Sequence, residues 1–212
     1  MKKIKYSEIT PEKIYNNRRS FVKSIGFGAG SLAIGSLPFL NNAIGSEQNN
    51  LTSYKDITTY NNYYEFGTSK GDPYKNSQNF KTKPWEISIE GEVDKPIKLS
   101  MEEISKSFVS EERIYRLRCV EGWSMVIPWM GFSLSKLLSK VNPNSKAKFV
   151  AFESVYDPEQ MKGQRYPVLN WPYKEGLRID EAMHPLTTVV TGLYNKKLPN
   201  QNGAPLRIFI PW

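Results

Sequence analysis

Cys119, the chain's single cysteine, is the residue best suited to chemistry in this sequence. It stands in residues 116–124 (RLRCVEGWS), where an alternating run meets a Glu-Gly turn. The flanking arginines favour a thiolate, which is the form of cysteine that attacks electrophiles and binds metals. An isolated cysteine is nevertheless more often a small buried hydrophobic residue. This segment alone leaves both interpretations open.

A cysteine nucleophile needs a nearby base, and the chain has one histidine, His184. This histidine follows residues 180–183 (DEAM) and precedes Pro185, and nothing in the spacing brings it beside Cys119. A single-histidine cysteine enzyme therefore stays an open alternative. We expect instead that His184 lies in a surface loop.

The composition argues against several classes of protein. One cysteine forbids an internal disulfide and any cysteine-rich zinc or iron–sulfur site, and no G-x-G-x-x-G or phosphate-loop lysine motif is present. The net charge is +8, but residues 1–50 hold seven Lys or Arg against three Asp or Glu, which leaves 22 against 18 for the rest. Those later basic residues are scattered rather than interleaved with aromatic residues, so we expect no nucleic acid among the partners.

Residues 1–45 are predicted to be an export signal. Basic residues precede a weakly apolar run, residues 24–40, which four glycines and a proline interrupt. Each glycine costs a helix about 1 kcal/mol, and the run is shorter than the roughly 20 apolar residues of a membrane span. Residues 17–23 (NRRSFVK) resemble the twin-arginine motif, which directs folded proteins, often with a cofactor inserted, to the periplasm. The alternative is an amphipathic or uncleaved surface segment.

Residues 46–212 are predicted to form a single β-rich α+β domain rather than a doubly wound one. Capping-box spacing starts a short helix at Ser100. A second helix is predicted from the helical spacing of four apolar residues, Leu134, Leu137, Leu138 and Val141. Polar residues 46–59 are expected to form a linker, and the turn-forming residues of 60–67, 71–73 and 157–176 predict loops.

Two kinds of pattern predict the strands of this domain. Alternation of apolar and polar residues predicts half-buried strands over residues 85–89 and 113–119. Continuous apolar runs predict buried strands over residues 148–152, 187–191 and 206–210.

Five ordered segments give the sequence a family resemblance. They are residues 60–66 (YNNYYEF), 115–125 (YRLRCVEGWSM), 151–154 (AFES), 180–186 (DEAMHPL) and 201–207 (QNGAPLR). In this order behind a twin-arginine signal, they resemble the catalytic subunit of the bacterial protein-methionine-sulfoxide reductase. That family consists of periplasmic molybdenum enzymes of the sulfite-oxidase fold, so the resemblance implies a Mo-molybdopterin cofactor.

The resemblance also implies a set of site residues. Cys119 would be the protein thiolate on molybdenum, a metal that prefers sulfur donors, and no catalytic residue beyond this ligand is implied. The residues that would bind the cofactor are Asn61, Tyr64, Glu65, Ser154, Asn202 and Arg207. Ser154 stands where the family has threonine, so a hydroxyl is kept and a methyl is lost. Arg207 would pair with the pterin phosphate as a forked donor.

The activity implied is oxygen-atom transfer from oxidised methionine in periplasmic proteins, with electrons from a haem-containing membrane subunit. Two departures from the family stand out. Residues 160–173 are shorter and different from the corresponding loop, and the sequence stops at residues 206–212 (LRIFIPW), where the family continues. We therefore expect a chain truncated at its carboxyl end, and its activity stays open.

Two alternatives remain at this point: a sulfite-oxidising molybdenum enzyme of the same fold, and a non-catalytic exported fragment. No arginine-rich stretch suited to an anionic substrate follows Cys119, which disfavours the sulfite enzyme.

Overall fold

The computed structural model describes residues 51–119 and 121–210. Contacts divide the chain into two units, residues 1–47 and 48–212, and every described residue belongs to the second. The export signal predicted for residues 1–45 lies outside the described residues. Within the described ranges, no helix has the length and apolar character needed to cross a membrane.

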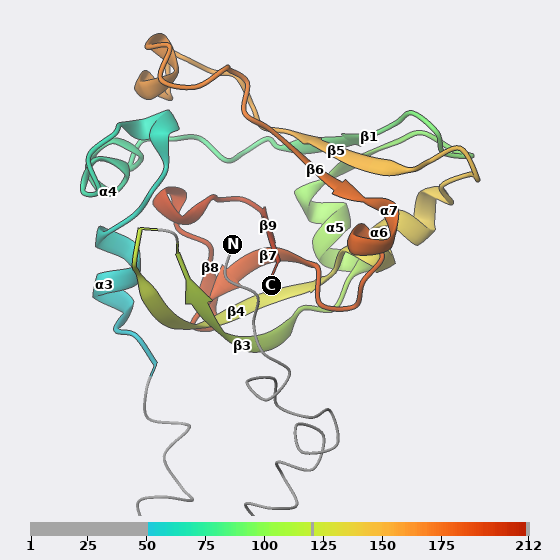
Figure 1. The fold of residues 1–212 in the computed structure, drawn as a ribbon, viewed down its shortest axis with the longest axis horizontal. Helices are drawn as coiled ribbons and strands as arrows, with labels where there is room; N and C mark the ends of the chain where they lie inside the picture. Colours follow the sequence, from blue (N-terminus) through green and yellow to red (C-terminus); the bar gives the residue numbers. More distant parts are fainter. Residues whose placement is uncertain (1–50, 120, 211–212) are drawn as a thin grey trace, which may run out of the picture. The chain divides into compact units, whose positions relative to one another are not determined.

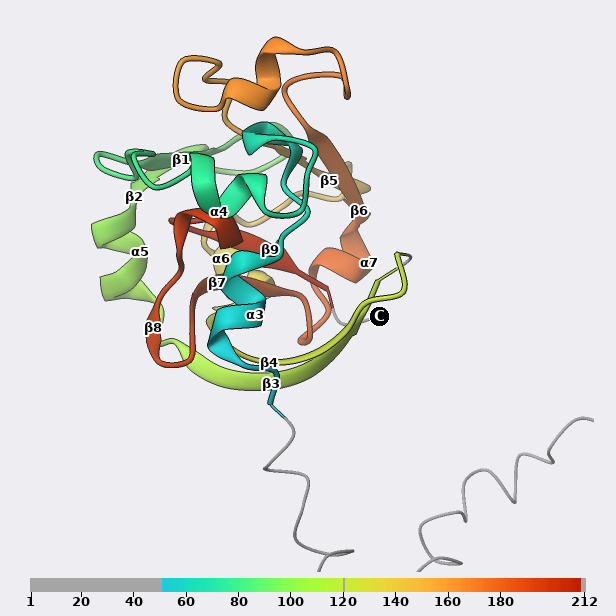
Figure 2. The same cartoon turned by 90° about the vertical axis from the view of Figure 1, so that its left-hand side faces the viewer.

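A five-stranded antiparallel sheet forms the centre of the described domain (Figure 1). Its strands are β3 (Glu111–Arg118), β4 (Ser124–Ser133), β7 (Thr188–Leu193), β8 (Lys196–Lys197) and β9 (Arg207–Phe209). The order is β3-β4-β7-β8, and β9 also pairs with β7. The long β3–β4 hairpin curves beneath α3 and β7 in Figure 2.

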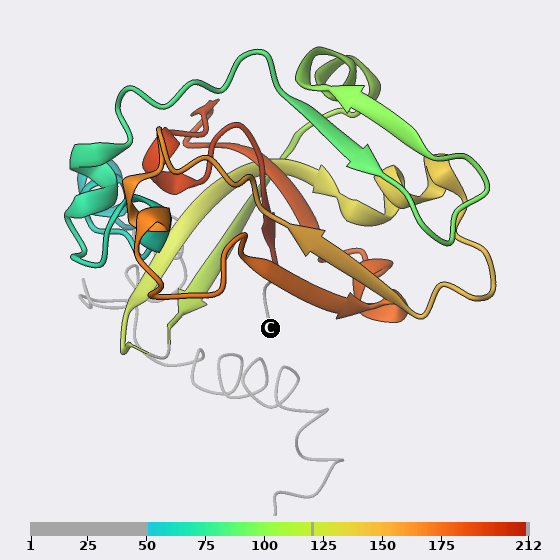
Figure 3. The same ribbon diagram turned by 90° about the horizontal axis from the view of Figure 1, so that it is seen from above.

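Two two-stranded ribbons and several short helices surround this sheet. The ribbons are β1 (Glu86–Ile89) with β2 (Ile97–Ser100), and β5 (Phe149–Glu153) with β6 (Lys174–Arg178). The α-helices are α3 (Tyr54–Thr59), α4 (Asp72–Asn76), α5 (Met101–Ser107), α6 (Leu134–Val141) and α7 (Ile179–Ala182). The 3₁₀ turns are η3 (Tyr64–Phe66), η4 (Lys162–Arg165) and η5 (Asn200–Asn202). Figures 1 and 3 both show α3 and α4 at the opposite end of the domain from α5 and the β1–β2 ribbon.

The β3–β4 hairpin forms as the alternation predicts. Tyr115 and Leu117 on one face of β3 are half-buried, whereas Ile114 and Arg116 on the other face are exposed. Because β3 ends at Arg118, the next residue opens the turn that leads into β4.

The core is built on α6 and on aromatic stacking. All four apolar residues predicted to face one side of that helix are buried: Leu134, Leu137, Leu138 and Val141. Beside them the rings of Phe108 and Phe132 stack with centroids 4.4 Å apart and planes within 5°. At the start of α5, the Ser100 side chain accepts a hydrogen bond from the Glu103 amide and the Glu103 carboxylate accepts one from the Ser100 amide, so the predicted capping box is confirmed.

Three local predictions were wrong. The expected linker contains α3, because Ser53 caps its first turn and Ile57, only 2% exposed, anchors it in the core. Residues 71–73 lead into α4, whose first turn accommodates Pro73 because proline needs no amide donor there. The strand around Phe149 is only half-buried: Phe149 is 72% exposed on the outer face of the β5–β6 ribbon, whereas Val150 and Phe152 on the other face pack against the core.

Candidate functional site

Asn61 and Asn202 converge on one backbone carbonyl. The side-chain Nδ2 of Asn61 donates to the Ile57 carbonyl at 2.9 Å, and that of Asn202 donates to the same oxygen at 3.1 Å. Both residues are buried, and neither Oδ1 atom has a hydrogen-bond partner among the described residues. A buried acceptor without a partner costs about 1–3 kcal/mol. The two amide oxygens therefore suit a ligand that carries N–H or O–H donors.

Arg207 adds a cation next to these amides. Its guanidinium donates to the Asn202 carbonyl at 3.1 Å and lies 5.5 Å from the centroid of the Trp129 ring. Burial lowers the pKa of Arg207 below its usual value. None of the ion pairs between described residues involves Arg207. The remaining N–H groups of its guanidinium can therefore donate hydrogen bonds to an anionic group.

Tyr63 and Glu65 bring a buried acid to the same region. Glu65 is 7% exposed, and burial raises the pKa of its carboxyl group above the usual value. The pKa of Tyr63 is raised to about 12, first by burial and then by the charge of Glu65, while Arg207 acts in the opposite direction.

Gly163 lets η4 pack directly on η3. A Cβ at this position would lie 1.9 Å from the Tyr64 carbonyl oxygen, so only glycine fits without movement. A cavity of about 440 Å³ opens beside this contact, lined in part by half-buried Tyr64 and by Lys162 and Tyr166. Because η4 belongs to the segment between β5 and β6, this contact joins that segment to the first predicted cofactor loop.

Ser154 lies where β5 leaves its ribbon. It is half-buried, and its amide donates to the Tyr173 carbonyl at 2.9 Å. The pKa of Tyr173 is raised by its hydrogen bond to Glu175, by burial and, in smaller part, by the charge of Glu65. The hydrogen bond from Ser154 to Tyr173 thus joins the two ends of the segment between β5 and β6.

The turn that begins at Cys119 packs against the same first loop. The Cys119 amide donates to the Trp123 carbonyl and the Gly122 amide donates to the Cys119 carbonyl, each at 2.9 Å. Gly122 has a φ of +83°, a left-handed conformation that favours glycine. The Trp123 ring lies 4.7 Å from that of Tyr60, centroid to centroid. The half-buried Cys119 thus opens a defined turn rather than lying in the core.

The structure excludes the cysteine–histidine pair. Arg113, at the far end of β3, donates to the Pro185 carbonyl at 2.8 Å, which fixes the residues next to His184 there. Cys119 lies six residues further along an extended strand that rises about 3.3 Å per residue, roughly 20 Å away. His184 is exposed, as expected for a surface loop.

Among the described residues, Cys119 belongs to no cluster of metal-ligating side chains. Across the residues that the structure describes, no group of three or more His, Cys, Asp and Glu side chains could hold a metal ion. A single thiolate suits a metal whose other ligands come from a cofactor. The orphaned amide oxygens, the uncompensated arginine and this thiolate together fit a metal–pterin group.

Comparisons with known proteins assign the family. The model of the oxidoreductase molybdopterin binding domain matches residues 74–212. The protein-methionine-sulfoxide reductase catalytic subunit MsrP of Xanthomonas axonopodis pv. citri is 50% identical over 97% of this chain. The chain belongs to the MsrP family. It spans 68% of that relative, and 70% of the MsrP of Pseudomonas syringae pv. tomato, to which it is 46% identical.

The fold has a counterpart among solved structures. The sulfane dehydrogenase SoxCD from Paracoccus pantotrophus superposes with a TM-score of 0.52 at 13% identity, covering 95% of this chain and 55% of that chain. At this identity the likeness speaks for the fold alone. Together with the matched domain, it confirms the predicted β-rich molybdopterin-binding fold of this MsrP family member.

Sequence reasoning did not single out Lys70 or Tyr63. Both lie in or beside the first predicted loop, but a lysine after Gly67 and one tyrosine among several carry no distinctive pattern.

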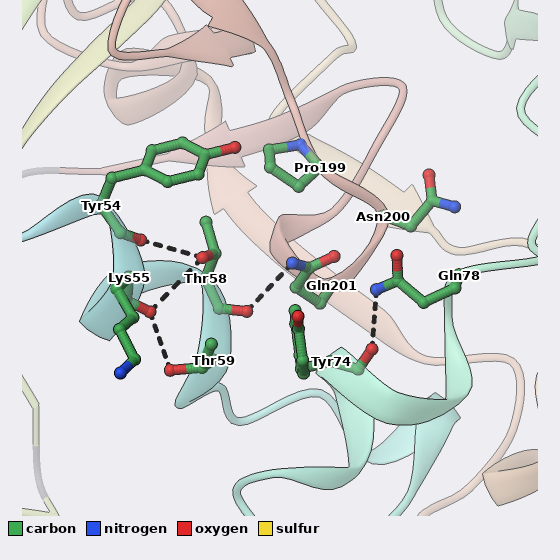
Figure 4. Close-up of a pocket in the computed structure, with 9 residues that line it drawn as sticks. All are labelled: Tyr54, Lys55, Thr58, Thr59, Tyr74, Gln78, Pro199, Asn200 and Gln201. Carbon is green, nitrogen blue, oxygen red and sulfur yellow. Dashed lines mark hydrogen bonds between the residues drawn. The ribbon is translucent and has the colours of Figure 1, made fainter.

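A separate cavity of about 550 Å³ lies between α3, α4 and η5, and Figure 4 shows the residues that line it. There the Gln201 amide donates to the Thr58 carbonyl at 3.0 Å, and none of the predicted cofactor residues lines this cavity.

Proposed function

We propose that this chain is a molybdopterin-dependent catalytic subunit that reduces methionine sulfoxide in periplasmic proteins. The relatives named above carry this activity in their names. The observation that carries the proposal is the packing of the Cys119 turn against the loop that holds Asn61, a residue whose side chain shares the Ile57 carbonyl with that of Asn202.

The chain's own residues divide the work of holding the cofactor. Cys119 would bind the metal through its thiolate. The amide oxygens of Asn61 and Asn202 would accept hydrogen bonds from the pterin, and Arg207 would donate to an anionic group. The other predicted cofactor contacts, Tyr64, Glu65 and Ser154, stay predictions. When bound, the cofactor supplies two-electron oxygen-atom transfer, which leaves a thioether where the sulfoxide was.

Burial makes these contacts more effective than they would be in water. Asn61, Asn202 and Glu65 are each less than a tenth exposed, so bulk solvent is largely excluded from around them. Charge-assisted hydrogen bonds strengthen in such surroundings. These residues would therefore orient the cofactor and exclude water from around it.

Metal analysis and activity of the purified full chain test the proposal. We expect equimolar molybdenum and reduction of methionine sulfoxide with an artificial electron donor. Cys119→Ser, which exchanges only sulfur for oxygen, should lose both. Metal-free wild-type protein, or metal retained in Cys119→Ser, would contradict the proposal, and oxidation of sulfite in place of sulfoxide reduction would assign the other chemistry of the fold.

We also propose a periplasmic location reached by the twin-arginine route, with the signal in residues 1–45 and the catalytic domain in residues 46–212. The basic and apolar order of residues 1–40 supports this. A folded fluorescent reporter fused after residue 45 should reach the periplasm, and a double change of Arg18→Lys and Arg19→Lys should retain it in the cytoplasm. If the double change leaves export of the reporter unaffected, the proposed twin-arginine route is wrong.

A haem-containing membrane subunit is the electron donor that we propose. The family resemblance supports it, since the reaction consumes two electrons in each cycle. Membranes containing the partner should support sulfoxide reduction with a respiratory donor, whereas the purified chain alone should not. Equal turnover without membranes would refute this partner.

A further inference from the structure

The Lys70 ammonium contacts a carboxylate, an amide oxygen and two aromatic rings. The Nζ atom lies 2.8 Å from a carboxylate oxygen of Glu121 and donates to the Asn62 side-chain oxygen at 2.8 Å. It also lies 5.6 Å from the ring centroid of Tyr64 and 5.4 Å from that of Trp123. A cation over two aromatic faces gains from both ring quadrupoles in addition to its ion pair.

These partners come from two segments that are far apart in the sequence. Asn62 and Tyr64 belong to the first loop, while Glu121 and Trp123 belong to the turn that begins at Cys119. The backbone of Lys70 is also tied to the first loop, because its carbonyl accepts the amide proton of Asn61 at 2.9 Å. Figures 1 and 3 show the tip of the β3–β4 hairpin on the side of the domain where α3 and α4 lie.

The turn transmits any displacement to the cysteine. Trp123 accepts the amide proton of Cys119, and Gly122 donates back to the Cys119 carbonyl. Holding Glu121 and Trp123 therefore holds the backbone that carries the thiol. An exposed ion pair alone would contribute little, but the Lys70 side chain is only 25% exposed and is enclosed by two rings.

We propose that Lys70 is a positioning residue: it fastens the Cys119–Trp123 turn to the first loop and so fixes where the thiolate is held for the metal. The role in catalysis rests on the proposed function, whereas the fastening of the turn does not. Lys70 contacts neither substrate nor metal in this scheme and acts through the turn.

Hydrogen exchange in the full chain tests the fastening directly. Lys70→Met should speed amide exchange at Cys119 and Gly122 by about tenfold, because the turn opens more often. Lys70→Arg keeps the charge and should restore slow exchange. Lys75→Met is the matched control: this exposed lysine of α4 forms no ion pair among the described residues, so its loss should leave the turn unchanged. Equal exchange in Lys70→Met and wild type would overturn the proposal.

The loaded enzyme gives a second measurement, which separates positioning from general stability. Lys70→Met should retain its molybdenum, shift the sulfur-to-metal absorption band and lower kcat by about tenfold or more, with KM changed less than about twofold. Lys70→Arg should largely restore the wild-type absorption band and the wild-type kcat. A lowered melting temperature, with an unshifted band from the molybdenum that remains bound, would indicate a merely structural role and would overturn the proposal.

The two proposals fail in different ways. If wild-type enzyme binds molybdenum and reduces the sulfoxide while Lys70→Met matches it in band and kcat, the inference is wrong and the proposed function stands. If wild-type protein binds no metal, the proposed function is wrong, and the exchange rates alone then support or overturn the fastening of the turn by Lys70.

Discussion

Gly163 offers the sharpest test of how the site is built. A Cβ at this position would lie 1.9 Å from the Tyr64 carbonyl oxygen and 2.8 Å from two backbone atoms of Glu65. Since real Cβ atoms stay at least 3.0 Å from such neighbours, Gly163→Ala requires η4 and η3 to separate by at least about 1.1 Å. All three obstructing atoms are backbone, so no side chain can rotate away.

The cost follows from this geometry. Overpacking that forces backbone shifts costs typically about 1–3 kcal/mol, which corresponds to a loss of about 3–10 °C in Tm for a domain of this size. Separation of η4 from η3 should also loosen Glu65 and reduce the amount of molybdenum retained. Denaturant unfolding and metal analysis of the same preparation measure both effects.

Gly176→Ala is the matched control, because no atom lies within 4 Å of a Cβ at Gly176 in β6. There the added methyl meets open space, and we expect a change in unfolding free energy of less than about 0.5 kcal/mol. Gly163→Ala with stability and metal content equal to those of Gly176→Ala would refute the close packing of η4 on η3.

Two further outcomes follow from the buried polar groups. A carboxyl group whose pKa is higher in the folded than in the unfolded chain destabilises the fold above its unfolded pKa. Glu65→Gln should therefore raise the Tm of the cofactor-free chain at pH 7, and this gain in Tm should disappear as the pH falls below about 4. A gain in Tm that grows in acid would contradict the raised pKa. Asn202→Ala removes one hydrogen bond to the Ile57 carbonyl and one orphaned acceptor, so it should change cofactor-free stability by less than about 1 kcal/mol. The same variant should lose molybdenum in the loaded enzyme, and undiminished metal would show that the Asn202 oxygen binds nothing.

Local patterns predicted the elements that depend on local physics. The alternation through Tyr115 and Leu117 placed Cys119 at the end of a strand, and the spacing from Leu134 to Val141 predicted α6. Residues 54–59 were missed as a helix because Thr, Asp and Lys dominate them. One buried side chain, Ile57, decides their structure, and its burial depends on distant strands.

The site itself depends on contacts that spacing cannot reveal. Asn61 and Asn202 meet at the Ile57 carbonyl, although most of the domain separates them in sequence. Only the family resemblance predicted that Asn61 and Asn202 belong to the same site. The separation of His184 from Cys119 could not be predicted either. It depends on the contact between Pro185 and Arg113 of β3, which is a tertiary contact.

The shared carbonyl of Ile57 has a consequence for biosynthesis. One of its two amide partners follows it by four residues in the sequence, whereas the other follows by 145 residues. A nascent chain therefore has only one of the two asparagines of this junction until the second has been translated. A cofactor that contacts both asparagines can be inserted only after the second has been translated and the two segments have folded together, and a chain exported unfolded would have to form this junction after crossing the membrane.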